Sequence, residues 1–440
     1  MMKQFWVGYW FKPWYFLYRI GYAIVISGIR GYFKNHQYDG KEKIPANTGV
    51  LYAVNHQNAF LDPIVIAGRT KEPTHFLARA DIFKKPMVAK ILSMIYMLPI
   101  YRQRDGVDTI KMNQKTFDTC FDILKNKGNV IIFPEGNHNY KKSLRPLKKG
   151  VSRIALGAAE KYNYDIDVKI VVLGLDYENH FKMNGSLYLN AGTPIDVSEY
   201  YENHKKNPSE TINNLSNRIY HTLDSLIINI KDDENYDELY YLLHRVPLEN
   251  NRNKVSLKFQ LRKERLEKIE KLVKTNASFY EEIISFMSEL KITMKKFKLR
   301  PYLLHQKPNS LISLFLYSLL LILFSPLHII GLTTNYLPYK TPVWFVNSKV
   351  KDKHFHSSLK MALGSLFFYL YWFIITIIFS QFFNLKFGML FFITLPLIAT
   401  FNYKYWIYFI KVRGLWNYKL NYKSILSLRE KYLDYHAKIK

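Results

Sequence analysis

A histidine and an aspartate stand close together at the end of a predicted strand. His56 and Asp62 occur in the stretch Asn-His-Gln-Asn-Ala-Phe-Leu-Asp-Pro, directly after a short apolar run. A histidine in such a place can act as a general base. An alcohol becomes an effective nucleophile when a base takes its proton as it attacks. A carboxylate partner would hold the imidazole in the required tautomer and stabilise the cation that forms.

The spacing of this pair restricts how the two side chains can meet. At about 100° per residue, the steps from His56 to Asp62 add up to roughly 240°, so the two cannot share one face of a regular helix. They can meet only across a turn, such as an elbow between a strand and a helix. The structural alternative is that Asn55 and Asp62 cap a helix and that His56 is incidental.

A second group of residues has the chemistry of a phosphate site. Residues 133–136, Phe-Pro-Glu-Gly, follow a predicted strand, where ligands of α/β folds tend to bind. A basic stretch comes next and leads into Gly150 at the start of a predicted helix, which suits a phosphate. The cations of this stretch are Lys141, Lys142, Arg145, Lys148 and Lys149. Arg102, directly after an apolar segment, could clamp a phosphate with two hydrogen bonds. A solvated surface position is the alternative for each cation.

Strands alternating with helices must position these residues. Short apolar runs bounded by turn formers predict buried strands, and longer patterned segments predict helices. The predicted strands are 48–56, 129–134 and 167–175, and the predicted helices are 85–98 and 150–161. This alternation predicts an α/β domain with a mixed sheet covered by helices, which we place at residues 41–250.

The segments on either side of this domain differ in composition. In residues 1–40, Trp, Tyr and Lys stand among apolar residues, which favours the membrane–water interface, and no signal-peptide cleavage site follows. Residues 14–32 form either a helix on the bilayer surface or a core helix of the α/β domain. Residues 251–305 are predicted to be a polar helical linker, because opposite charges recur three or four residues apart.

Residues 306–415 are predicted to be membrane segments. A run of about 20 apolar residues can cross a bilayer. The apolar runs are 311–332, 359–383 and 385–401. Basic residues favour the cytoplasmic side for the loop 333–358 and for the tail 416–440. Three full crossings cannot satisfy this with a cytoplasmic catalytic domain, so our hypothesis makes the first run a re-entrant segment bent at Pro326.

Composition narrows the class of partner. The 440 residues carry a formal net charge of +28, and 48% of them are hydrophobic. Such an excess of positive charge fits nucleic acid or an anionic membrane face. The apolar segments favour the membrane, and no motif for nucleic-acid binding is present, so we expect no nucleic acid. The single cysteine, Cys120, excludes an intrachain disulfide and a cysteine-rich metal site within these residues.

Together these residues resemble the glycerol-phosphate and lysophospholipid acyltransferase family over roughly residues 48–197. His56 and Asp62 match the family's His–Asp motif, in which the histidine is taken as the base. The segment 75–102 resembles the one leading to the second motif, with Arg102 at the arginine thought to bind the acceptor phosphate. Residues 133–136 match the third motif, which helps to hold the acceptor.

Other matches and departures refine the resemblance. Lys148 matches a lysine linked with phosphate binding, 170–177 resembles the fourth motif, and 192–195 resembles the strand end that follows. Most members place four residues between the histidine and the aspartate, whereas this chain has five. Many follow the glycine of the third motif with Thr-Arg, where this chain has Asn-His, and Arg145 is our suggested replacement. The wider spacing is more similar to the fungal-type glycerol-3-phosphate and dihydroxyacetone-phosphate acyltransferases.

The resemblance implies transfer of a fatty acyl group to a hydroxyl of glycerol 3-phosphate or 1-acylglycerol 3-phosphate in phospholipid biosynthesis. The donor would be acyl-CoA or acyl carrier protein, and neither a metal nor a redox cofactor would be needed. His56 and Asp62 would be catalytic. The substrate-binding residues would be Asn55, Arg102, Glu135, Gly136, Arg145 and Lys148.

The expected setting is a membrane, with membrane phospholipids as partners and the catalytic domain on the cytoplasmic face. Three alternatives stay open. The acceptor could be another lysophospholipid or an aminolipid. The chain could also be a non-catalytic lipid-binding protein, or a transporter that uses the apolar segments.

Overall fold

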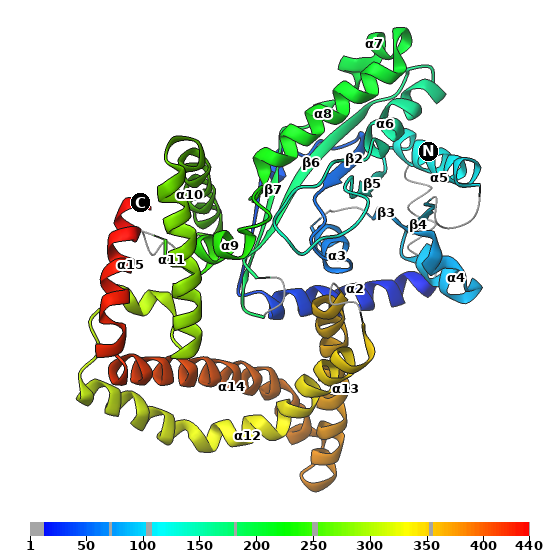
Figure 1. Cartoon of the computed structure of the whole chain (residues 1–440). Coiled ribbons are helices and arrows are strands. Elements are labelled where there is room, and N and C mark those ends of the chain that lie inside the picture. Colours follow the sequence, from blue (N-terminus) through cyan, green and yellow to red (C-terminus); the bar gives the residue numbers. More distant parts are fainter. Residues whose placement is uncertain are drawn as a thin grey trace. The chain divides into compact units, whose positions relative to one another are not determined.

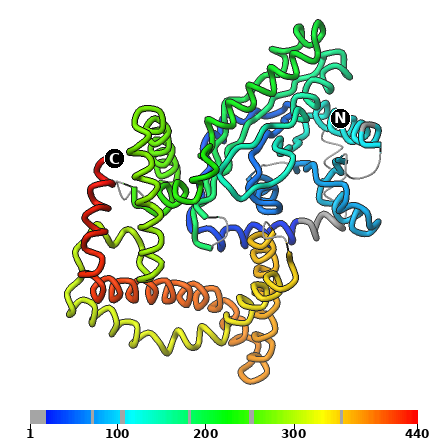
Figure 2. Tube along the Cα trace, in the orientation of Figure 1, coloured from blue at the N-terminus to red at the C-terminus, as the bar shows by residue number. Residues whose placement is uncertain are grey.

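The chain folds as two compact units. The computed structural model describes residues 13–69, 73–102, 108–179, 183–248, 254–351 and 355–439. One unit comprises Met1–Asn229 together with Asp352–Met361, and the other comprises Ile230–Lys351 and Ala362–Lys440. Figure 2 allows each segment to be followed by its residue number. The long continuous part of the first unit therefore ends at residue 229, whereas the α/β domain was predicted to end at residue 250.

The first unit is built on a mixed sheet of eight strands (Figure 1). The strands are β1 (Asn35–Asp39), β2 (Gly49–Val54), β3 (Thr74–Arg79), β4 (Met97–Ile100), β5 (Asn129–Ile132), β6 (Val168–Tyr177), β7 (Ser186–Ala191) and β8 (Ile195–Asp196). Their order is β1-β7-β6-β2-β5-β3-β4, and β8 pairs with β6. The pairs of β6 with β7 and β8 are antiparallel, and the other pairs are parallel. The predicted mixed α/β sheet is confirmed.

Helices cover both faces of this sheet. They are α2 (Pro13–Tyr32), α3 (Leu61–Ala67), α4 (Pro86–Met94), α5 (Thr109–Lys125), α6 (Gly150–Lys161), α7 (Tyr201–Lys206) and α8 (Pro208–Leu226), with short 3-10 turns at Lys41–Lys43, Ala80–Phe83 and Val197–Tyr200. Successive side chains of a strand point to opposite faces. Leu51 and Ala53 of β2 accordingly pack with α5, α6 and α8. Tyr52 and Val54 pack with α3 and the end of α2 on the other face.

Two predicted elements differ from the observed ones. The helix predicted over 85–98 ends at Met94, and residues 97–100 form β4 instead. The helix predicted over 14–32 exists as α2, and its last turn buries Ile29 and Tyr32 in the core. That end of α2 is therefore a core helix, as one of the two alternatives proposed.

The second unit is helical. Its elements are α9 (Tyr236–His244), α10 (Val255–Thr275), α11 (Ala277–Lys296), a 3-10 turn at Pro301–His305, α12 (Leu311–Lys349), α14 (Leu385–Leu420), a 3-10 turn at Lys423–Ile425 and α15 (Leu426–Ile439), with α13 (His356–Phe382) beyond residue 361. The helix α10, in the predicted polar linker, buries one face that includes Arg265. Its guanidinium donates hydrogen bonds to carbonyl groups at the end of α9 and just beyond it. Those bonds satisfy the buried charge.

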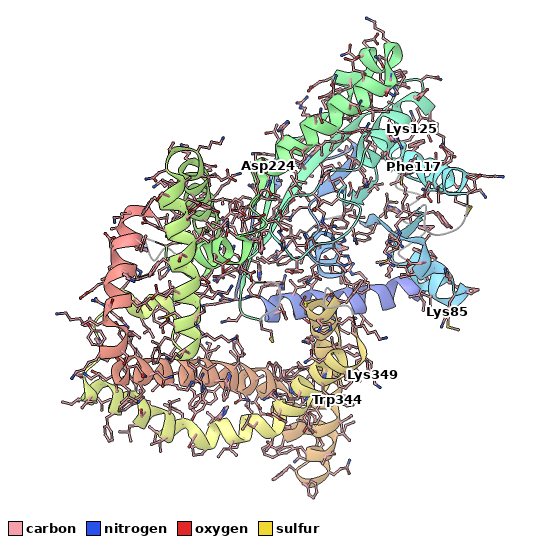
Figure 3. All side chains as sticks on the ribbon, in the orientation of Figure 1. Lys85, Phe117, Lys125, Asp224, Trp344 and Lys349 are labelled. Atoms are coloured by element: carbon pink, nitrogen blue, oxygen red, sulfur yellow. The ribbon has the colours of Figure 1, made fainter. Side chains whose placement is uncertain are left out.

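Among the described residues, three helices are long and apolar enough to cross a membrane, namely α12, α13 and α14. They contain the three predicted apolar runs, except for Phe383 at the end of the second run, and associate the chain with a membrane. Trp344 and Lys349 stand near the C-terminal end of α12 (Figure 3), and such residues favour the membrane–water interface.

The helix α12 is continuous through Pro326, where the sequence predicted a bend. A proline leaves the carbonyl group four residues earlier without its helical donor. Here the Ser325 hydroxyl donates to the Ile322 carbonyl at 2.8 Å, which supplies the missing hydrogen bond. Re-entry of this segment into the membrane stays a prediction.

Candidate active site

The turn between β2 and α3 brings the predicted histidine and aspartate together. The strand β2 ends at Val54, and Asp62 lies in the first turn of α3. His56 Nδ1 lies 2.9 Å from Asp62 Oδ2. The aspartate is fully buried, whereas the histidine side chain keeps 12% exposure and can meet a substrate. The pair meets across a strand-to-helix elbow, as the spacing required.

The Asp62 carboxylate is held from several sides. The backbone N–H groups of Gln57 and Asn58 each donate to Oδ2 at 2.8 Å. The Tyr177 hydroxyl donates to Oδ1 at 2.7 Å. Burial and the neighbouring carboxylate raise the pKa of Tyr177 well above its usual range, so this hydroxyl remains a donor. These contacts fix the carboxylate, which in turn fixes the imidazole ring.

Glu135 anchors the backbone of His56. Ala53 of β2 pairs with Ile132 of β5 in parallel, and His56 and Glu135 each lie three residues further along. This register places them side by side, and His56 N donates to Glu135 Oε1 at 2.8 Å. Burial raises the pKa of Glu135, against opposing effects of hydrogen bonds and charges from His56 and Arg145. The Glu135 carboxyl group thus holds the backbone of the loop that carries His56.

Replacement Glu135→Gln should stabilise the protein at alkaline pH. Glutamine keeps an oxygen that can accept from His56 N and carries no buried charge. Because the folded-state pKa is raised, ionised Glu135 costs stability as pH rises from its ordinary value of 4.5 through the raised pKa. Thermal unfolding in detergent, followed by circular dichroism from pH 4 to pH 8, should show a growing advantage of the variant. A variant that loses stability relative to wild type with rising pH would contradict this.

The loop after Glu135 is shaped by a glycine and a lysine. Gly136 has a φ of +70°, and a Cβ there would stand 3.3 Å from the Lys148 side chain. Lys148 N donates to the Pro134 carbonyl, which folds the basic stretch back onto residues 133–136. Gly136 is therefore needed for the backbone conformation and for the approach of Lys148.

Two polar residues that the sequence singled out, Asn55 and Lys142, bond to other residues of the protein. Both polar atoms of the Asn55 amide bond the backbone of Leu175, at 2.9 and 2.7 Å. Asn55 thus ties the end of β2 to β6, and its predicted contact with substrate stays a prediction. Lys142 is buried in an ion pair with Asp176 and is removed from any phosphate site on the surface of the loop.

Arg102 lies apart from the predicted cations of the loop after Glu135. Lys148 is exposed and Arg145 is half-buried near Glu135. Arg102 follows β4 at the same sheet edge as His56, but β5 and β3 lie between β4 and β2. Three strand spacings amount to about 14 Å. Arg102 NH2 lies 3.6 Å from Asp81, a carboxylate that Arg79 also contacts.

Several residues of the site escaped the sequence analysis. Tyr177 is one of them, although it closes the segment 170–177. The rings of Phe133 and His138 also contact His56, with centroids at 4.0 and 5.6 Å. No local pattern marks an aromatic residue as the partner of a distant carboxylate or imidazole. The available signal was their position within a predicted strand or a few residues after one.

Removal of the Tyr177 hydroxyl should separate positioning from packing. Tyr177→Phe keeps the ring against Phe33 but removes one donor from Asp62. We expect a loss of about 1–3 kcal/mol in unfolding free energy, because the lost hydrogen bond is to a charged group. We also expect roughly a 10-fold lower kcat, by analogy with the loss of other orienting contacts.

A matched control is available at the sheet edge. The Tyr188 hydroxyl donates to Asp39 at 2.9 Å, outside the candidate site. Tyr188→Phe should therefore cost similar stability and leave kcat unchanged in the same assay. Equal kcat losses in the two variants would assign the effect of Tyr177 to stability alone.

A family model matches one part of the chain. The model is described as Acyltransferase and matches residues 35–175. These residues hold β1 to β5, most of β6 and both catalytic candidates. They match an acyltransferase domain, which supports the predicted resemblance over this stretch.

The acyltransferase domain has relatives in yeast and in bacteria. The chain is 39% identical over 128 residues to glycerol-3-phosphate O-acyltransferase 2 of Saccharomyces cerevisiae, covering 29% of this chain and 17% of that protein. It is 30% identical over 132 residues to the 1-acyl-sn-glycerol-3-phosphate acyltransferase of Bacillus subtilis, covering 30% of this chain and 60% of that protein. The crystal structure of the 1-acyl-sn-glycerophosphate acyltransferase PlsC from Thermotoga maritima aligns with a TM-score of 0.33 and 18% identity, over 47% of this chain and 80% of that chain.

Proposed function

We propose that this membrane-associated chain transfers a fatty acyl group from an acyl thioester to a hydroxyl group of glycerol 3-phosphate. The observation that carries the proposal is the 2.9 Å contact between His56 Nδ1 and buried Asp62 inside an acyltransferase domain. A histidine oriented in this way is equipped to activate an alcohol.

The proposed reaction runs in one displacement on the thioester. The Asp62 carboxylate accepts a hydrogen bond from His56 Nδ1–H, which fixes the tautomer with the free lone pair on Nε2. Nε2 takes the proton of the acceptor hydroxyl while the oxygen bonds to the thioester carbonyl carbon. The carbon–sulfur bond then breaks, and the departing thiolate takes the proton from the imidazolium. The products are an ester and a free thiol, and the reaction as written needs no metal or redox cofactor.

A route through an acyl-cysteine is disfavoured. Cys120 is the one cysteine of the sequence, and it lies on α5 with its side chain buried in the core. Burial raises the pKa of its thiol to about 12, so the nucleophilic thiolate is scarce at neutral pH. Direct attack by the acceptor hydroxyl is therefore the favoured route.

Cations on the sheet edge are the proposed ligands of the acceptor phosphate. Arg145 and Lys148 lie on the loop that folds back onto residues 133–136. Arg102 follows β4 at the same edge of the sheet. A glycerol phosphate held over the intervening strand ends would lie between His56 and Arg102. Neutralising the phosphate with guanidinium and ammonium groups would fix the hydroxyl near the base.

The choice of glycerol 3-phosphate rests on two features. Five residues separate His56 from Asp62, the wider spacing that is more similar to the fungal-type enzymes. The yeast relative, at 39% identity, is a glycerol-3-phosphate O-acyltransferase. The second candidate acceptor is 1-acylglycerol 3-phosphate, which the name of the Bacillus subtilis relative favours. The chain spans 17% of the yeast relative and 60% of the bacterial one.

The proposal also covers the acyl donor and the side of the membrane on which the catalytic domain lies. Acyl-CoA and acyl carrier protein are both anionic, and both suit a chain of net charge +28. Basic residues in the tail 416–440 and in the segment 333–358, which was predicted as a loop but is helical up to Lys349, favour the cytoplasmic face for the catalytic domain.

The test is an acyl-transfer assay on the purified full chain in detergent. Labelled glycerol 3-phosphate and labelled 1-acylglycerol 3-phosphate are supplied in separate reactions, each with acyl-CoA and with acyl carrier protein as donor. Product from glycerol 3-phosphate supports the proposal. Product from 1-acylglycerol 3-phosphate alone would replace the first acceptor with the second, and no product from either would refute both.

A further inference from the structure

A short segment from far outside the acyltransferase domain lies in the catalytic unit. We call residues 355–361 the α13 head, because α13 begins at His356. Residues 352–361 belong to the first unit, although the family match ends at residue 175. Met361 is 5% exposed and packs in the core on the α3 face of the sheet. The head is therefore anchored in the catalytic unit.

The α13 head is hydrogen-bonded to the catalytic turn. Asn58 Nδ2 donates to Ser357 Oγ at 2.6 Å, and both side chains are buried. The backbone N–H of the same Asn58 donates to Asp62 Oδ2. One residue thus connects the carboxylate that orients His56 with a serine about 300 positions further along the chain.

Aromatic rings continue this contact toward the histidine. The Phe355 ring lies 5.1 Å from the ring of Phe60 and 5.4 Å from the ring of His138, centroid to centroid. His138 in turn contacts the ring of His56 at 5.6 Å. Phe60 sits on the catalytic turn and is 37% exposed. An unbroken row of rings therefore runs from the catalytic imidazole to the start of α13.

We propose that Phe60 and Phe355 form a subsite for the hydrocarbon chain of the fatty acyl substrate. The inference rests on the proposed function and adds a segment outside the acyltransferase domain to its site. A fatty chain needs an apolar surface near the reacting carbonyl group, and two phenylalanine rings that reach the base through the His138 ring offer one. The helix that carries the α13 head continues as an apolar candidate membrane span up to Phe382.

Either substrate can supply such a chain. The thioester donor always carries one, and a 1-acylglycerol 3-phosphate acceptor carries a second, whereas glycerol 3-phosphate carries none. Reactions with glycerol 3-phosphate and donors of different chain length report the donor chain alone. Reactions with a short-chain donor and 1-acylglycerol 3-phosphates of different length report the acceptor chain.

The test compares chain-length dependence in variants of the full chain. Phe60→Ala and Phe355→Ala should each lower kcat/KM about 10-fold for the long-chain substrate and less than 2-fold for a six-carbon one, because only the long chain covers the rings. Ile91→Ala removes another exposed apolar side chain of the same unit and should change neither value. The subsite would be overturned if the phenylalanine variants lost kcat/KM equally for long and short chains, or lost none, both when the donor chain is varied and when the acceptor chain is varied.

A second measurement does not depend on turnover. A palmitoyl-CoA carrying a photoreactive diazirine in its chain is irradiated with the full-length wild type and with Phe355→Ala in detergent. We expect wild-type label on peptides that contain Phe60 or the α13 head, and less of it in the variant. Label confined to other peptides would overturn the subsite. A wild type that binds at these peptides but transfers no acyl group would refute the proposed function and keep the subsite.

Discussion

Replacing His56 with alanine should lower kcat for acyl transfer about 1,000-fold, within the range expected for loss of a general base. The reason is that His56 is the one imidazole hydrogen-bonded to Asp62 among the described residues. The fold should persist, because Asp62 keeps its bonds to Gln57 N, Asn58 N and the Tyr177 hydroxyl. Initial rates at saturating donor and acceptor, with circular dichroism of the same samples, measure both effects.

The matched control is a histidine of the same unit. His221 is exposed on α8, outside the candidate site, and His221→Ala should retain the wild-type rate. Substantial activity in folded His56→Ala would remove the histidine from the mechanism. A variant that fails to fold would instead show an essential structural role for the ring that stacks on Phe133.

Replacing Asp62 with asparagine should damage both catalysis and stability. Three N–H or O–H donors besides His56 point at this buried carboxylate. An amide nitrogen in place of one oxygen would face a donor, which costs about 2–4 kcal/mol of unfolding free energy. It would also favour the wrong imidazole tautomer, so kcat should fall by about 1,000-fold or more.

The same substitution elsewhere separates the two effects. Asp39 accepts hydrogen bonds from the Tyr188 hydroxyl and from Gln37 near the edge of the sheet. Asp39→Asn should lower the midpoint of thermal unfolding without changing kcat at temperatures where it is folded. If Asp62→Asn behaved in the same way as Asp39→Asn, the orienting role of Asp62 would be lost.

The strands of the fold differ in how well the sequence predicts them. β2, β5 and β6 are buried on both faces, and their continuous apolar runs are typical of such strands. β1 reads Asn-His-Gln-Tyr-Asp and lies at a sheet edge, where polar residues are tolerated, so it carries no apolar signal. β4 contains Pro99 and was predicted as helix. Proline is accepted there because β4 is the opposite edge of the sheet.

The contacts of the site also differ in how well the sequence predicts them. Some follow from the spacing of neighbouring residues, and others depend on residues far apart in the chain. The meeting of His56 and Asp62 across a turn follows from their spacing, because a helix would separate them. The contact of His56 with Glu135 needs the register of two parallel strands, which the sequence order alone does not specify. Tyr177 lies 115 positions along the chain from its partner Asp62, and Ser357 lies about 300 positions from its partner Asn58. No local sequence pattern encodes such pairings.

In the proposed reaction, the chain couples cleavage of an acyl thioester to acylation of a glycerol-phosphate hydroxyl. The most direct measurement follows both products in one reaction of the purified full chain with acyl-CoA and labelled glycerol 3-phosphate. Free thiol and labelled acyl glycerol phosphate should appear in equal amounts, and both should be lost in His56→Ala. Thiol release without the labelled ester, or at the same rate in the absence of acceptor, would contradict the claim.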